Sequence, residues 1–154
     1  MTAEEICHTV NQYPQDAIIV LTGGEPSLFI DENLVEKLHT CGSHRRYITI
    51  ETNGTHSLPK GIDWVTLSPK IGFNGGSQSP EEIVLKRCDE LKVVNCGQDL
   101  SQYNFIQTDN RFLQPCYLPD EEAREANLRE CIEIIKKHPS WRLSLQTHRM
   151  IQIQ

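Results

Sequence analysis

Short apolar runs, separated by polar or amphipathic stretches, set the hydrophobic pattern of this chain. The run 17–21 is apolar and rich in β-branched residues, a pattern typical of a strand buried on both faces in a parallel sheet. Further short runs bounded by turn or polar residues predict strands at 47–50, 64–67, 91–94, 111–113 and 142–145. The sequence therefore predicts a sheet of about six strands.

A helical period marks three stretches between these runs. Thr2 and Glu5 form a capping box that begins the first helix, and Pro14 ends it. The face predicted to be buried comprises Ile6, Val10 and Tyr13. In the second helix the apolar stripe is Leu34, Val35 and Leu38, with Gly42 as the C-cap.

The third and longest predicted helix begins at an N-cap, Asp120, and ends in a basic turn before Pro139. Its predicted buried face comprises Leu128, Cys131, Ile132 and Ile135. By contrast, the links 52–63 and 70–79 hold Gly, Asn, Ser and Pro with little helical period, too irregular for a regular eight-unit barrel. We expect one domain over residues 1–154: an α/β fold, a reduced and open barrel of mainly parallel strands with few helices.

Composition excludes several classes of function. The net charge of −6 and pI near 5.5 argue against a nucleic-acid partner, which requires a basic face. No apolar stretch is long enough to span a bilayer and the first residues are acidic, so we expect a cytoplasmic protein without a membrane partner.

The six cysteines are scattered, so we expect reduced thiols. No two are spaced as C-x2-C or C-x3-C, and this predicts no local metal or cluster site. Cys116 beside Gln114 and Pro115 is a weak candidate nucleophile, and a buried structural thiol is the better interpretation.

Polar residues and glycines follow nearly every predicted strand. These tails are 22–26, 51–54, 68–70, 114–115 and 146–148. In a parallel barrel the carboxyl ends of the strands share one rim, where such folds place their sites. We expect the five tails to converge on one mouth.

Each tail has a functional and a structural interpretation. Gly23 and Gly24 allow a close backbone approach, and Glu25 can accept hydrogen bonds from an ammonium group or cap a helix. Glu51 and Asn53 suit the hydroxyls of a ribose or form a turn. Lys70 and Lys92 could each meet a carboxylate or be solvated surface charges. His148 could contact a ligand or be a histidine satisfied in the core.

Together the tails resemble a known family. Residues 21–26, Leu-Thr-Gly-Gly-Glu-Pro, resemble the GGEP motif with which radical S-adenosylmethionine (SAM) enzymes bind the methionyl amino group. In order and spacing, five further segments resemble 7-carboxy-7-deazaguanine synthases: 51–55, 67–70, 90–94, 112–115 and 141–148. The resemblance covers essentially the whole chain.

The resemblance implies a reaction in which SAM yields a 5′-deoxyadenosyl radical and 6-carboxytetrahydropterin becomes 7-carboxy-7-deazaguanine with loss of ammonia, on the route to queuosine. It implies SAM, a 4Fe–4S cluster and Mg²⁺ as cofactors, a homodimer, and a reducing protein such as flavodoxin or ferredoxin. The implied SAM pocket comprises Gly23, Gly24, Glu25, Glu51, Asn53, Ser68, Pro69, Lys70, Gln114 and Pro115. The implied pterin contacts are Thr22, His148 and Gln154.

The chain departs from the family pattern at one point. The resemblance implies a first strand, three cluster cysteines and a magnesium-binding threonine ahead of the first helix seen here, so we expect no metal ligands and an exposed, aggregation-prone edge at the strand beginning at Ala17. One alternative is a non-catalytic remnant or subunit that binds SAM or the pterin. A second, an activating enzyme for a glycyl-radical protein, does not predict the ending 144–148.

Overall fold

The computed structural model describes residues 1–73, 78–151 and 153. Six strands form one sheet in which every pairing is parallel and the spatial order follows the chain. They are β1 (Ile19–Leu21), β2 (Ile48–Thr52), β3 (Trp64–Leu67), β4 (Glu90–Asn95), β5 (Arg111–Pro115) and β6 (Trp141–Leu143). The predicted set of parallel strands is confirmed.

Helices of two kinds connect the strands. The α-helices are α1 (Ala3–Val10), α2 (Glu32–Thr40), α3 (Glu121–Lys137) and α4 (Thr147–Met150), and the short 3-10 helices are η1 (Pro26–Leu28), η3 (Pro80–Glu82) and η4 (Leu100–Tyr103). Parallel strands need crossover connections, but only β1 to β2 and β5 to β6 are joined through longer α-helices. The irregular link predicted at 52–63 is confirmed, and part of 70–79 lies outside the described residues.

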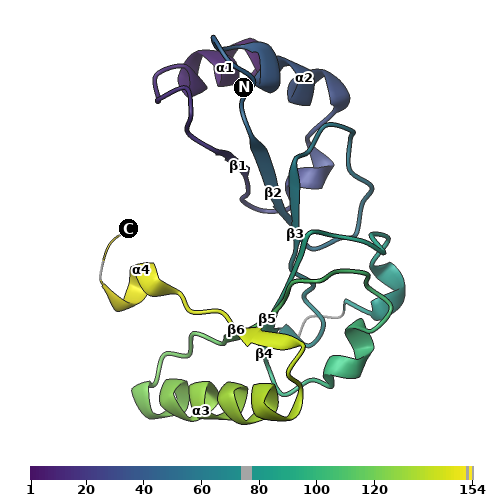
Figure 1. The fold of residues 1–154 in the computed structure, drawn as a ribbon, viewed down its shortest axis with the longest axis vertical. Coiled ribbons are helices and arrows are strands. Elements are labelled where there is room, and N and C mark those ends of the chain that lie inside the picture. Colours follow the sequence, from purple (N-terminus) through teal and green to yellow (C-terminus); the bar gives the residue numbers. More distant parts are fainter. Residues whose placement is uncertain (74–77, 152, 154) are drawn as a thin grey trace.

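The sheet curves into a crescent that hydrogen bonds do not close, because β1 and β6 are its two free edges (Figure 1). Helices α1 and α2 pack at the β1–β2 end and α3 packs against β5 and β6 at the other end. Figure 1 shows α4 on the concave side. The α/β fold is therefore an open partial barrel, as the sequence predicts.

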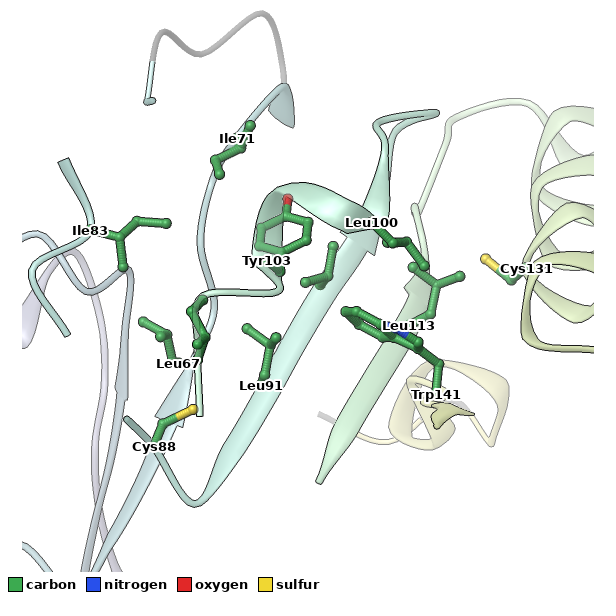
Figure 2. Close-up of a cluster of buried hydrophobic side chains, with 12 residues drawn as sticks. Leu67, Ile71, Ile83, Cys88, Leu91, Leu100, Tyr103, Leu113, Cys131 and Trp141 are labelled. Carbon is green, nitrogen blue, oxygen red and sulfur yellow. The ribbon is translucent and has the colours of Figure 1, made fainter. Parts of the chain in front are cut away.

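The larger core lies on the convex face of the sheet. It joins β3, β4, β5 and β6 to α3 and to the loops around η3 and η4 (Figure 2). At its centre the Tyr103 and Trp141 rings meet edge to face, with centroids 6.4 Å apart. Figure 2 shows Cys131 of α3 pointing into this cluster near Leu113. We call this side the covered face and the concave side the open face.

Two predicted N-caps are confirmed, but one predicted C-cap and two predicted packing positions are wrong. Thr2 and Glu5 form the capping box of α1, and Asp120 caps α3. Tyr13 lies beyond α1 and is 63% exposed, since the helix already ends at Val10. The C-cap of α2 is Cys41 in a right-handed conformation, so Gly42 does not cap it. On α3 it is Ile134, not the exposed Ile132, that packs on the core.

The prediction that residues 17–21 are buried on both faces is also wrong. Ile19 and Leu21 pack against the small core under α1 and α2, whereas Ile18 and Val20 are 58% and 52% exposed. They are exposed because β1 is an edge strand and its concave side carries no helix. The predicted exposed edge is thus present.

Candidate functional site

The open face of the sheet carries a group of polar and charged residues at its centre. Strand alternation puts these residues opposite the covered face, since their neighbours Ile50, Leu67, Leu91, Val93 and Leu113 are fully buried. The polar residues of this face are Thr49 and Glu51 of β2, Thr66 of β3, Glu90 and Lys92 of β4, Gln114 of β5 and Arg142 of β6, and Val20, Val94 and Phe112 share the face with them. A barrel interior that binds a charged ligand requires such a lining.

Glu25 ties the tail of β1 to the tail of β2. It caps η1, and its Oε1 accepts hydrogen bonds from the Ser27 amide (3.1 Å), the Ser27 hydroxyl (2.6 Å) and the Thr52 hydroxyl (2.6 Å). Its Oε2 accepts one from the Asn53 amide at 2.7 Å. Oε1 thus shares its lone pairs among three donors, whereas Oε2 has a single donor and can take one more.

This network also sets the charge of Glu25. Burial of the carboxyl raises its pKa, but hydrogen bonds from Ser27, Thr52 and the Asn53 amide outweigh burial and hold the pKa below the ordinary glutamate range. Glu25 is therefore an anion at neutral pH. The helix-capping interpretation is confirmed, and it leaves the ammonium interpretation open because one acceptor position remains.

Asn53 serves mainly to shape the loop after β2. Its Oδ1 accepts hydrogen bonds from the amide (2.9 Å) and hydroxyl (2.7 Å) of Thr55, which closes an Asx turn. Its carbonyl accepts one from the Gln78 side chain at 3.1 Å. The turn interpretation is confirmed, and the Asn53 Nδ2 group is the part of this side chain left to meet a ligand.

The β3 tail comes next to this loop. Pro69 is buried, and the Lys70 amide donates to the Gln78 side chain, so Gln78 joins the β2 and β3 tails. The Lys70 ammonium turns back over the Ser68 hydroxyl at 3.1 Å and the Phe73 ring. Burial of this end lowers the pKa of Lys70, although Glu51 and Glu25 nearby oppose the shift.

Lys92 lies in the middle of the sheet and belongs to a cluster of charged side chains. Its ammonium lies 3.7 Å from the Glu51 carboxylate and 3.3 Å from that of Glu90. With Glu25 and Lys70 close enough to interact, three carboxylates face two ammonium groups. The cluster therefore has one net negative charge and favours a cationic ligand.

The β5 and β6 tails form a second group. Ser144 donates to the Gln114 side chain at 3.5 Å, and Asn127 of α3 accepts from the Cys116 amide at 2.8 Å. Pro115 and Cys116 line a pocket of about 570 Å³ between the β5 tail, α3 and α4. Cys116 is half-buried there.

The remaining predicted residues are exposed or lie outside the described residues. Thr22, Gly23 and Gly24 are exposed, and both glycines have positive φ, 91° and 57°, with open space where a Cβ would be. His148 is exposed on α4, five residues after β6 has ended at Leu143. Gln154 lies outside the described residues.

Sequence reasoning missed three parts of the Glu25 network: Ser27, Thr52 and Gln78. Thr52 could have been identified from the sequence, because it ends a strand and its neighbours Glu51 and Asn53 were already candidate site residues. Gln78 carried none, since it reaches the site from an irregular loop.

Comparison with known proteins identifies the family of this chain. A 7-carboxy-7-deazaguanine synthase of Bacteroides thetaiotaomicron is 45% identical over 154 residues, which cover 100% of this chain and 74% of the relative. The synthase of Bordetella pertussis is 39% identical over 98% of this chain and 66% of the relative. No family model matches the chain. The chain belongs to the 7-carboxy-7-deazaguanine synthase family.

Relatives extend further than the chain does. A 7-carboxy-7-deazaguanine synthase of Burkholderia multivorans is 38% identical over 137 residues, and this chain covers 59% of its length. Within the described residues, no group of three or more His, Cys, Asp or Glu side chains could hold a metal ion. None of the described helices is long and apolar enough to cross a membrane.

The thiols of this family member are all free. Cys88 and Cys131 are buried, and burial raises the pKa of each to about 11. Such thiols stay protonated at neutral pH and act as small apolar core residues. The expectation of reduced thiols is confirmed, whereas Cys116, predicted to be a buried structural thiol, is only half-buried.

Proposed function

We propose that this chain supplies the SAM- and pterin-binding part of a 7-carboxy-7-deazaguanine synthase. The reaction is a carbon–nitrogen lyase step: 6-carboxytetrahydropterin becomes 7-carboxy-7-deazaguanine with loss of ammonia, in queuosine biosynthesis. The observation that carries the proposal is the joining of the β1, β2 and β3 tails around Glu25 beside an anionic open face. The printed names of the relatives support the same activity.

The net charge of the open face suits SAM. SAM carries an ammonium group, a carboxylate and a sulfonium, and so has one net positive charge, which the cluster of three carboxylates and two ammonium groups complements. Glu25 Oε2 would accept from the methionyl ammonium. Gly23 and Gly24 would let the backbone approach, since no side chain occupies their space.

The rest of the proposed SAM pocket follows the rim. Glu51, half exposed, would accept from the ribose hydroxyls, and Asn53 Nδ2 would donate to them. Lys70 would pair with the methionyl carboxylate from its place over Ser68. The other contacts would come from Ser68, Pro69, Gln114 and Pro115.

The pterin would lie between the SAM pocket and the C-terminal segment. Thr22 at the β1 tail and His148 on α4 are exposed toward solvent and so accessible to a substrate. Gln154 is proposed as a third contact. We also propose that the protein forms a homodimer and receives electrons from a small reducing protein.

The described residues do not fit a 4Fe–4S cluster, because they hold no group of ligands for a metal ion. We therefore place the cluster ligands, and those of Mg²⁺, outside them. The same observation favours the second candidate, a non-catalytic SAM- or pterin-binding protein.

Anaerobic reconstitution with iron and sulfide separates the two candidates. Residues 1–154 and a version extended upstream would be compared for bound iron and for 7-carboxy-7-deazaguanine, detected by mass spectrometry. The proposal predicts about four irons and product in the extended protein only. Product in neither, with SAM still bound, supports the non-catalytic candidate, and four irons on residues 1–154 contradict the placement of the ligands.

A further inference from the structure

Lys92 stands at the centre of the open face without an assigned role. It lies on β4, with its ammonium 3.3 Å from Glu90 on the same strand and 3.7 Å from Glu51 on β2. The Lys92 and Glu90 side chains are only 26% and 18% exposed, whereas that of Glu51 is 50% exposed. The pair Lys92–Glu51 thus spans β3 and joins a shielded cation to an accessible carboxylate.

This arrangement argues against Lys92 as a binding group for a ligand anion. Its charge already lies between two carboxylates, so a third would meet a net negative surrounding. The two carboxylates that Lys92 meets belong to the chain itself and not to a ligand. Its effect must therefore be sought in what it does to Glu51 or Glu90.

Glu51 is the partner whose position matters for a ligand. Register puts Glu51, Thr66 and Glu90 in one row across the open face, and Lys92 one step nearer the carboxyl ends of the strands. A half-exposed glutamate is free to rotate into solvent unless a charge holds it. The ion pair with Lys92 draws the Glu51 carboxylate toward β4. Glu51 and Glu25 both lie close enough to the Lys70 ammonium to act on its charge.

We propose that Lys92 is a positioning residue for ligand binding: it fixes the Glu51 carboxylate so that it can accept hydrogen bonds from the ribose hydroxyls of SAM. This inference rests on the proposed function, which places the ribose at Glu51. The preference for a ligand with ribose hydroxyls over one without them then depends on an ion pair between β4 and β2.

The test compares two ligands that differ only at the ribose. S-adenosylhomocysteine and its 2′,3′-dideoxy analogue are titrated calorimetrically into the 154-residue chain and its variants. In the wild type the hydroxylated ligand should bind about tenfold more tightly. Lys92→Met should remove most of that preference, Lys92→Arg should keep it, and Lys136→Met, which removes an exposed ion pair on α3, should leave it unchanged.

A double-mutant cycle distinguishes positioning from a general loss of structure. If Lys92 acts through Glu51, Lys92→Met has no further effect on the ribose preference in a Glu51→Gln background. Lys92→Gln replaces Lys92→Met if the latter fails to fold, as judged by its melting curve. Additive effects, or a preference that survives in Lys92→Met, overturn the inference while leaving SAM binding intact. A wild type that binds neither SAM nor S-adenosylhomocysteine overturns the proposed function as well.

Discussion

At the scale of the residue, Glu25 does two things with one carboxylate. It accepts four hydrogen bonds that fix the β1 and β2 tails, and it keeps one acceptor position on Oε2. A residue with this many internal partners is held in place before any ligand arrives. Preorganisation of this kind reduces the entropy lost on binding.

The lowered pKa of Glu25 gives a pH-dependent stability. Because the folded pKa lies below the unfolded one, the contribution is present above the ordinary glutamate range and is lost as pH falls through the lowered pKa. At neutral pH, Glu25→Gln should lower the free energy of unfolding by about 1 kcal/mol. Urea denaturation should show the difference from wild type shrinking in acid, and a constant difference would contradict the assignment.

Arg46 is a second residue whose role is local. It is 1% exposed, and its guanidinium donates to the Pro14 carbonyl at 3.0 Å and, at 3.3 Å, to the Val10 carbonyl and the Asn11 side chain. Its Nε has no partner among the described residues. Arg46 therefore caps the carboxyl end of α1 from inside the molecule.

Replacing Arg46 should be costly. Arg46→Ala removes three hydrogen bonds to the end of α1 and opens a cavity in place of a fully buried side chain, so we expect a loss of about 3 kcal/mol in the free energy of unfolding. Arg129→Ala is the matched control, since Arg129 is 70% exposed and pairs only with Glu125, and it should cost less than about 0.5 kcal/mol. Equal losses in urea denaturation would show that burial of Arg46 is unimportant.

Residue roles were predictable where chemistry was local and not where it depended on distant partners. The two interpretations of Glu25 could be written from the motif alone, and both are compatible with the structure. Arg46 gave no signal, because its acceptors lie 32 to 36 residues earlier in the chain. Its burial is a consequence of how α1 packs, which no periodicity reports.

At the scale of the element, β1 is the exposed edge of the sheet. Val20 and Ile18 present apolar side chains beside an unpaired strand edge, a combination that promotes association between chains. A charge at Val20 should interfere with such association at little cost to stability.

Two matched substitutions test this role of the edge. Val20→Lys should lower self-association measured by light scattering, with a change of about 0.5 kcal/mol or less in unfolding free energy. Val84→Lys removes an equally exposed valine, 50% against 52%, outside any strand, and should leave association as it is. The same reduction in both variants would mean that exposed apolar area, not the strand edge, drives association.

Elements themselves were largely predictable, and their ends and buried faces less so. Apolar runs indicated all six strands because a parallel sheet buries them on the covered face. The error at 17–21 arose because the same β-branched run fits an edge strand covered on one side only. Ile132 was misassigned because α3 is anchored through Cys131, Ile134 and Ile135, a rotation that the pattern alone does not fix.

At the scale of the whole molecule, the open crescent explains why the site is polar. One face of the sheet packs on the core, and the other carries charges that a closed or helix-covered sheet would not tolerate without partners. The joining of the β1, β2 and β3 tails was predictable from the rule that parallel strands share a rim, whereas the β5 and β6 tails form a second group. The sequence could not predict whether Thr22 and His148 contact the same ligand, because α4 lies beyond the end of β6.

Calorimetric titration of SAM into the 154-residue chain tests the central claim, that the open face binds SAM through Glu25. Wild type and a control, Glu133→Gln, altered at an exposed acid of α3, should bind SAM alike. Glu25→Gln should bind about tenfold more weakly, because a neutral amide replaces the carboxylate that meets the ammonium. Equal affinity in all three proteins, or no binding by the wild type, would contradict the account.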